Sequence, residues 1–193
     1  MTIEKATEAD APGLLEIYGP YVEQTAISFE YEVPSLEEFR GRIRSISQKY
    51  PYLKAVDDQG RILGYAYAAP FKSRAAYDWA VETTIYIRRE NRGGGLGRAL
   101  YQALEASLKA MGICNLNACI ACTEKEDAHL TNDRMAFHRH LGYTPVGIFH
   151  RCGYKFDTWY DMIWMEKLIA PHTSPQSPVR FGQWELPSFS DVF

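Results

Sequence analysis

The chain has 193 residues, of which 46% are hydrophobic and 23% charged, and its formal net charge is −3. This length supplies one well-buried core and is too short for two ordinary domains, so we expect one folded domain. The small negative charge excludes the broad basic field that nucleic acid or an anionic membrane surface requires, and we expect neither partner.

The N-terminal segment predicts a strand followed by two helices. Residues 2–6 can form a short strand, after which Thr7 or Asp10 can cap a helix whose apolar residues recur at helical spacing. A second helix begins after Ser35, because Glu38 three residues later completes a capping box. A proline then ends this helix.

Three strands follow the two helices. Residues 52–56 and 62–69 flank a turn sequence rich in aspartate and glycine, so they predict an antiparallel hairpin. The run 81–87 alternates and is rich in β-branched residues, which favours a third strand. A polar and aromatic segment, residues 71–79, separates this strand from the hairpin.

The second half predicts a helix, a strand, a helix and two strands. Leucines recur at helical spacing over residues 96–111, and a glycine follows at the position that ends a helix. Residues 113–120 form the next predicted strand, and a charged loop leads to a short helix over residues 132–141. Residues 144–150 and 159–167 are the last two predicted strands.

The C-terminal segment is Pro/Ser-rich and shows few anchors. We therefore expect a folded domain at residues 1–168 and a C-terminal arm at residues 169–193. Its apolar side chains could pack on a second subunit. These side chains are Phe181, Trp184, Leu186 and Phe189.

Neither a targeting sequence nor a metal site is expected. The N-terminus lacks a charged region followed by an apolar stretch, and no segment offers the roughly 18 uninterrupted apolar residues of a membrane span. Four cysteines are too few and too unevenly placed for a disulfide framework, and the Cys119-x-x-Cys122 spacing is only half of a zinc site. We expect a cytoplasmic protein with reduced thiols and no metal.

A glycine-rich segment lies between the third predicted strand and the helix at 96–111. It reads Arg92-Gly93-Gly94-Gly95-Leu96-Gly97-Arg98. Consecutive backbone N–H groups at the start of a helix can converge on an anion, so a phosphate is the natural ligand. The segment matches neither the Walker A loop nor the GxGxxG fingerprint of dinucleotide sites. The spacing R-x-x-G-x-G remains, with a tight glycine turn that binds nothing as the alternative.

Taken together, these features resemble the GNAT superfamily, and more closely its phosphinothricin and methionine sulfoximine N-acetyltransferases. The resemblance covers about residues 2–168. It lies in the order of the elements and in Tyr77-Asp78-Trp79, Glu82, Tyr86, the glycine segment, His138, Leu141-Gly142-Tyr143 and Gly153-Tyr154-Lys155. It implies a homodimer and an α/β fold of α+β type. In that fold a central mixed, mostly antiparallel twisted sheet of about seven strands is flanked by about four helices.

The resemblance also implies that acetyl-CoA is the cosubstrate. Ile85, Tyr86 and Ile87 would offer backbone groups to the pantetheine arm. The pyrophosphate would lie against the glycine segment, that is Arg92, Gly93, Gly94, Gly95, Leu96, Gly97 and Arg98. Asn132 is a further predicted contact. The sequence departs from the family in a longer, charged loop at residues 122–131 and at Arg134, where a proline is common.

The implied reaction needs a base, because an amine attacks a thioester only in its neutral form. Glu82 is the predicted base, acting directly or through water, since a partly desolvated carboxylate has a raised pKa. His138 is the predicted proton donor to the departing thiolate, with Tyr143 and Tyr86 as alternatives. The alternatives without a catalytic role are that Glu82 is a solvent-facing strand residue and that His138 supplies the positive charge that is favourable at a helix C-terminus.

Lys72, Arg74 and Tyr77 form a polar set suited to the anionic groups of a small substrate. The resemblance implies that this segment binds the acid groups of the acceptor, with Phe29 as an apolar wall. We therefore expect acetyl transfer, by direct attack on the thioester, to phosphinothricin, methionine sulfoximine or sulfone, or a related L-amino acid. The alternatives are a peptide or protein N-acetyltransferase and a non-catalytic acyl-CoA-binding module.

Overall fold

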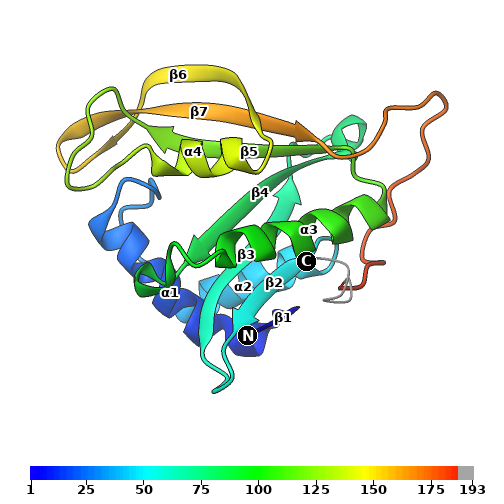
Figure 1. Cartoon of the computed structure of the whole chain (residues 1–193), viewed down its shortest axis with the longest axis horizontal. Helices are drawn as coiled ribbons and strands as arrows, with labels where there is room; N and C mark the ends of the chain where they lie inside the picture. Colours follow the sequence, from blue (N-terminus) through cyan, green and yellow to red (C-terminus); the bar gives the residue numbers. More distant parts are fainter. Residues whose placement is uncertain (187–193) are drawn as a thin grey trace.

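The computed structural model describes residues 1–186, in which one seven-stranded sheet carries helices on both faces (Figure 1). In chain order the elements are β1 (Thr2–Lys5), α1 (Ala11–Gln24), α2 (Leu36–Ser47), β2 (Tyr52–Val56), β3 (Ile62–Pro70), β4 (Ala80–Ile87), α3 (Leu96–Met111), β5 (Asn115–Cys122), α4 (Asp133–His140), β6 (Thr144–Lys155) and β7 (Thr158–Leu168). The expected element order and fold class are confirmed.

The sheet has the strand order β1-β2-β3-β4-β5-β7-β6, and every neighbouring pair is antiparallel except β4 and β5. The parallel pairing of β4 with β5 covers only the three residue pairs from Ala80↔Asn115 to Glu82↔Asn117. Beyond Glu82 the two strands diverge, as Figure 1 shows. This divergence opens the middle of the sheet and positions the site described below.

The two faces of the sheet are covered by different helices. Alternation along β4 turns Val81 and Ile85 toward the cluster that packs on α3, and Tyr86 toward the cluster that packs on α1 and α2. Glu82 shares the face of Tyr86, because every second side chain along a strand points to the same side. No helix among residues 1–186 is long and apolar enough to cross a membrane.

The sixth strand is longer than predicted. It continues through residue 155 instead of ending at residue 150. After a bulge between Phe149 and Gly153, β6 pairs with β7 again. In this bulge the backbone N–H of Arg151 donates to the Asp161 carboxylate at 2.7 Å. The strand lies at the edge of the sheet, and most of its residues are exposed.

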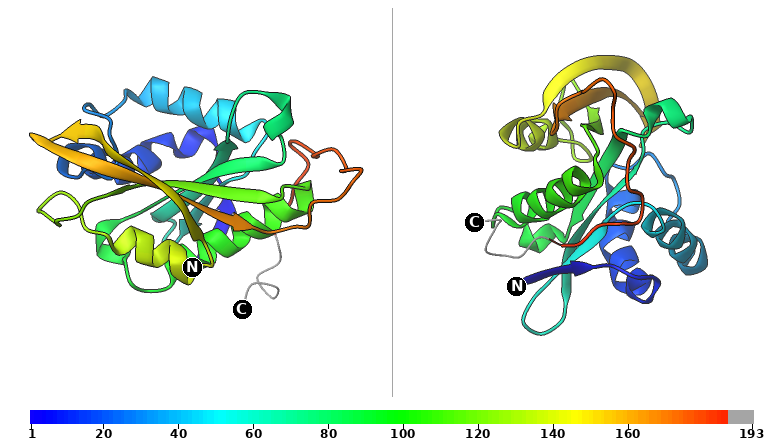
Figure 2. Two further views of the ribbon diagram at one scale, coloured as in Figure 1. Left: turned by 90° about the horizontal axis from the view of Figure 1, so that it is seen from above. Right: turned by 90° about the vertical axis from the view of Figure 1, so that its right-hand side faces the viewer.

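The prediction that the C-terminal arm lacks anchors is wrong for residues 171–186. The arm runs back from β7 past α3 toward the N-terminal strand (Figure 2). Its backbone binds the ends of two helical segments, with Arg180 donating to the Met111 carbonyl at 2.9 Å and Gly182 to the Lys49 carbonyl at 3.0 Å.

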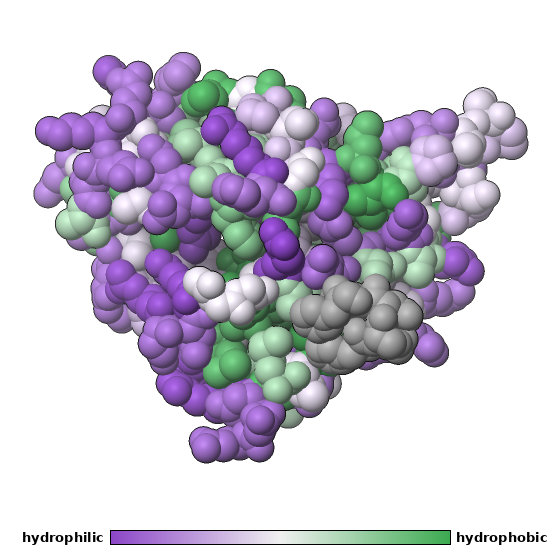
Figure 3. Space-filling view, in the orientation of Figure 1, coloured by the Kyte–Doolittle hydropathy of each residue, from purple (hydrophilic) through white to green (hydrophobic). Residues whose placement is uncertain are grey.

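The apolar side chains of the arm in the described residues are partly buried against their own domain. The Phe181 ring packs edge-on against Tyr50, and the Lys5 ammonium lies 4.3 Å from the Trp184 ring centroid. Leu186 also packs on the core, whereas Phe189 lies outside the described residues. These side chains already have partners, so they no longer argue for a second subunit. The face seen in Figure 3 is mostly hydrophilic, with small apolar areas between.

Candidate active site

A pocket of about 550 Å³ lies where β4 and β5 diverge. The end of β4 and the glycine segment form one side, and the first turn of α4 forms the other. Among the predicted cofactor residues, the following line this pocket: Ile85, Ile87, Arg92, Gly93, Gly95, Gly97 and Arg98. The structure thus brings most of the predicted set together around one cavity.

The glycine segment has a backbone that leaves its amides accessible. Gly95 is the N-cap of α3 and has a φ of 81°, a left-handed conformation that favours glycine. No atom lies within 4 Å of the position that a Cβ would take at Gly93, Gly94 or Gly95. Open space in front of a helix N-terminus fits a phosphate group.

Four predicted cofactor residues do not line this pocket: Gly94, within the glycine segment, and three whose side chains lie elsewhere. Tyr86 points to the opposite face of the sheet, where its ring meets Tyr18 and Tyr21 edge-on. Leu96 is buried in the core. The Asn132 side chain bonds the backbone N–H and carbonyl of Thr123, at 3.2 and 2.9 Å, so it braces the charged loop.

His138 lines the pocket, but its ring is fully engaged. Its Nδ1 lies 2.8 Å from the Arg134 carbonyl, which can only accept, so this nitrogen carries the proton. Its Nε2 then accepts from the Tyr101 hydroxyl at 3.0 Å. Burial lowers the pKa of His138 to about 4. The expectation of an imidazole that titrates near neutral pH is therefore wrong, because the ring is neutral and lacks an acidic proton.

The alternative proton donors are also buried. The Tyr143 hydroxyl lies 3.0 Å from the Thr83 hydroxyl in a closed network beneath β4. Burial raises the pKa of Tyr143 and of Tyr86 well above the usual range. Both phenols are thus weak acids.

Glu82 lies where the parallel pairing ends. Its backbone is in register with Ala69 of β3 and Asn117 of β5. Burial raises the pKa of the Glu82 carboxyl, and the charge of Lys72 opposes this rise in part. A carboxylate with a raised pKa beside a cavity is suited to accept a proton.

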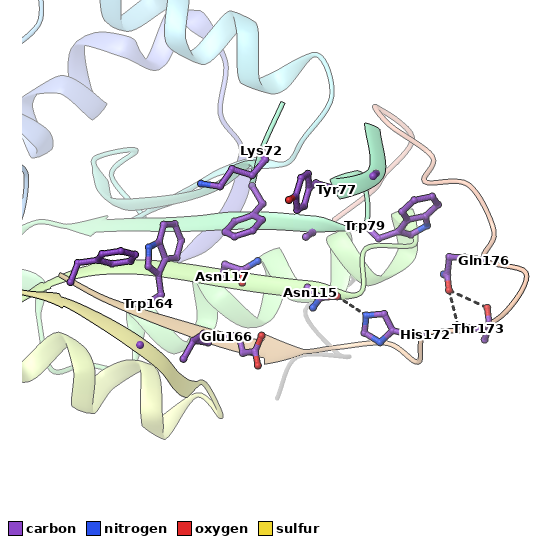
Figure 4. A pocket seen from close by; sticks show the side chains of 16 residues that line it. Lys72, Tyr77, Trp79, Asn115, Asn117, Trp164, Glu166, His172, Thr173 and Gln176 are labelled. Carbon is purple, nitrogen blue, oxygen red and sulfur yellow. Dashed lines mark hydrogen bonds between the residues drawn. The ribbon is translucent and has the colours of Figure 1, made fainter. Parts of the chain in front are cut away.

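A second pocket, of about 840 Å³, begins beside Asn117 on the face that carries Glu82. Figure 4 shows Lys72 and Tyr77 on one side of it and Trp164 and Glu166, from β7, on another. The Lys72 ammonium lies 4.8 Å from the Phe71 ring centroid and 5.5 Å from that of Trp164. Lys72 thus brings a positive charge into an aromatic cavity close to Glu82.

The other two predicted acceptor residues lie apart from this pocket. Arg74 is the N-cap of a short 3-10 turn and is exposed. Phe29 packs so closely on the β6–β7 hairpin that a Cβ at Gly153 would lie 2.3 Å from its ring. Phe29 joins a cluster around Ala121 of β5, so it flanks the same face of the sheet further along.

The loop that carries Phe29 is fixed by a buried cation. The Lys155 ammonium, 3% exposed, donates to the carbonyls of Val22, Thr25 and Ser28 at 2.6, 3.0 and 2.7 Å. These bonds connect the end of α1 and the following loop to the β6–β7 hairpin. Sequence reasoning gave Lys155 no role, because its three acceptors lie more than 120 positions away.

Several lining residues of the second pocket were missed. Asn115 and Asn117 alternate with apolar residues in β5, a polar pattern that could have indicated a lined cavity. His172 comes from the C-terminal arm and bonds Asn115 at 2.7 Å (Figure 4), and no local signal marks it. Within residues 1–186 there is no group of three or more His, Cys, Asp or Glu side chains that could hold a metal ion.

Comparison with known proteins gives consistent matches. The family model described as acetyltransferase (GNAT) domain matches residues 3–164. A phosphinothricin N-acetyltransferase from Streptomyces viridochromogenes is 34% identical over 180 residues, covering 92% of each chain. An L-methionine sulfoximine/L-methionine sulfone acetyltransferase from Pseudomonas aeruginosa is 33% identical over 174 residues, covering 90% of this chain and 97% of the other.

A solved structure agrees with these matches. The phosphinothricin acetyltransferase of the GNAT superfamily from Sinorhizobium meliloti, crystallised with AcCoA, has a TM-score of 0.81 and 31% identity to this chain. The match covers 94% of this chain and 98% of the other.

Proposed function

Because the chain belongs to the GNAT acetyltransferase family, we propose that it acetylates the amino group of a small amino-acid-like acceptor. It is an N-acetyltransferase that uses acetyl-CoA. The acceptor and the mechanism are the proposed part. The observation that carries the proposal is Glu82, a carboxyl with a raised pKa on β4 between Ala80, which lines the cavity of Lys72, and Ile85, which lines the glycine pocket.

On the cofactor side, the thioester arm lies between the diverging strands β4 and β5. At Ile85 and Ile87, β4 pairs with β3 but no longer with β5, so its free edge is available to the pantetheine amides, where the Ile87 carbonyl also accepts from the Tyr21 hydroxyl at 2.5 Å. The exposed amides of Gly93 and Gly95 then hold the pyrophosphate at the positive end of α3. This arrangement places the acetyl group near the point where the two strands separate.

On the acceptor side, Glu82 takes a proton from the ammonium form of the substrate, directly or through water. The neutral amine attacks the acetyl carbon, a C–N bond forms, the C–S bond breaks, and the nitrogen releases its extra proton to solvent to give the amide. Among His138, Tyr143 and Tyr86, none offers an acidic proton to the pocket, so we propose that the CoA thiolate is protonated from solvent. Asn132 and His138 then have structural roles: the first holds the charged loop, and the second is part of a buried hydrogen-bond network.

The Lys72 charge supports an anionic acceptor. An ammonium in an aromatic cavity attracts a carboxylate, sulfonyl or phosphinate oxygen more strongly than a solvated lysine would. Tyr77 adds a hydroxyl on the same side (Figure 4). The named activities of the similar proteins, on phosphinothricin and on methionine sulfoximine or sulfone, indicate the same substrate class.

We also propose a homodimer, formed through the exposed face of β6. Val146 and Phe149 are 61% and 57% exposed, and Trp159 on the neighbouring strand is 58% exposed. Exposed apolar residues on an edge strand mark an interaction surface. Sedimentation of the full chain at micromolar concentration should give a dimer, and Val146→Lys with Phe149→Glu should give a monomer. A monomeric wild type would refute this proposal.

The function is tested by thiol release from acetyl-CoA with a panel of acceptors. The panel contains phosphinothricin, methionine sulfoximine, methionine sulfone, common L-amino acids and several peptides. We expect turnover with small anionic amino acids and none with peptides. Turnover with peptides alone would support a peptide N-acetyltransferase, and cofactor binding without any turnover would support a binding module.

A further inference from the structure

Two arginines from distant parts of the chain face the same aromatic ring in the glycine pocket. The Arg92 guanidinium lies 5.3 Å from the Tyr21 ring centroid and the Arg134 guanidinium lies 5.2 Å from it. Arg92 also donates to the Tyr21 hydroxyl at 3.0 Å. Two cations are therefore held close together in one cavity.

Neither cation has an anionic partner. Within residues 1–186, no carboxylate lies within 4.0 Å of either guanidinium. Five other arginines form ion pairs, for example Arg88 with Glu16 at 2.9 Å and Arg44 with Glu8 at 2.6 Å. Asp133 lines the same pocket, but its carboxylate accepts from the Thr131 hydroxyl at 3.0 Å and forms no ion pair with either arginine.

The position of Arg134 is set by its helix. It lies in the first turn of α4, and its carbonyl is held by His138 at 2.8 Å. Its side chain lines the same pocket as Gly93 and Gly95, which belong to the opposite side. Burial lowers the pKa of the Arg134 guanidinium, and the charge of Arg92 acts in the same direction. A half-buried cation that faces another cation gains strongly from a bound anion.

We propose that Arg134, together with the Arg92 side chain, binds the diphosphate of acetyl-CoA from the side opposite to the glycine amides. This inference rests on the proposed placement of the cofactor in the glycine pocket. The glycine amides would contact one side of the diphosphate and the two guanidinium groups the other.

The test is direct binding of three ligands to the full chain and to Arg134→Gln. The ligands are CoA, dephospho-CoA, which lacks the 3′-phosphate, and pantetheine, which lacks all phosphates. We expect CoA and dephospho-CoA to bind Arg134→Gln roughly 10- to 100-fold more weakly, and pantetheine to bind equally well. Arg134→Lys should recover part of the loss. Arg139→Gln, an exposed arginine of the same helix, is the matched control and should change nothing.

Each other pattern overturns the inference. An equal loss for all three ligands would mean that Arg134 only maintains the shape of the groove. A loss for CoA but not for dephospho-CoA would assign the contact to the 3′-phosphate. Unchanged binding would remove Arg134 from the site. Wild-type protein that binds CoA tightly yet acetylates no amino acid would refute the proposed acceptor class and leave this inference intact.

Discussion

The cofactor pocket and the acceptor pocket are built in different ways. The cofactor side comes mainly from one continuous stretch, residues 85–98, and uses backbone groups. The acceptor side uses side chains from the segment after β3, from β5, from β7 and from the C-terminal arm. The first is therefore visible as a sequence motif, whereas the second exists only once the chain has folded. Variants that affect one side and spare the other test this division.

The largest effect is expected for Glu82→Gln. Loss of a general base should lower kcat/KM for the acceptor by about 10²- to 10⁴-fold, while the affinity for acetyl-CoA stays within about twofold. Since the carboxylate is the active form, wild-type activity should fall as the pH drops through the raised pKa of Glu82. Steady-state kinetics against pH measure this, with Glu124→Gln on the charged loop as control. A variant that retains full turnover would rule out Glu82 as the base.

The next effect is expected at Lys155, which should affect both sides. Lys155→Met leaves three buried carbonyls without their donor, which should lower the free energy of unfolding by about 2–4 kcal/mol. The loop that these bonds fix carries Ile27, which lines the glycine pocket, and Phe29, so its movement should raise KM for both substrates. Denaturant unfolding and two-substrate kinetics measure these quantities. Unchanged stability together with unchanged KM values would contradict this role of Lys155.

An effect on the cofactor side alone is expected at Gly95. Gly95→Ala forces a left-handed backbone on a residue with a side chain, at a cost of about 1–2 kcal/mol, and places a methyl group before the phosphate. Affinity for acetyl-CoA should fall several-fold, with KM for the acceptor unchanged. Gly41→Ala is the control, since its added methyl group meets nothing within 4 Å inside α2, and it should slightly stabilise the protein.

The smallest effect concerns His138, which lies beneath the cofactor side. Its pKa is about 4 in the folded chain and 6.5 in its ordinary state, so only the unfolded chain takes up a proton between these values. Its contribution to stability is fully present above pH 6.5 and is lost as the pH falls toward 4. In His138→Gln, the part of the fall in the unfolding midpoint between pH 6.5 and 4 that is due to His138 should be missing. Parallel curves for both proteins would show that the ring is not buried as described.

Much of the fold follows from local patterns in the sequence. The capping box at Ser35 and Glu38 gives a helix that begins at Leu36, and the Ser35 side chain accepts from the Glu38 backbone as expected. The strand β6 was predicted too short, because its bulge depends on Asp161, which is distant in sequence. The arm was predicted to have few anchors, because Met111 and Lys49, whose carbonyls bind it, belong to other parts of the chain.

In the site, too, the sequence predicted the features that depend on neighbouring residues and missed those that depend on distant ones. The glycine segment could be identified because its residues are contiguous and need only a helix behind them. The chemistry of His138 could not be predicted, because its pKa depends on burial and its bond to Tyr101 depends on how α3 packs. Arg74 was grouped with Lys72 by proximity in sequence, but only Lys72 lines the pocket, whereas Arg74 caps the short turn that follows it.

The brief pairing of β4 with β5 also has a consequence for the lifetime of the protein in a cell. Three residue pairs and the packing of α3 hold two half-sheets together, and a cofactor between the strands adds contacts to both. A ligand at 100 times its dissociation constant stabilises the folded state by about 2.7 kcal/mol. Proteases degrade chains that open, so an abundant supply of acetyl-CoA should slow turnover of the enzyme. Its amount would then follow the metabolite that it consumes.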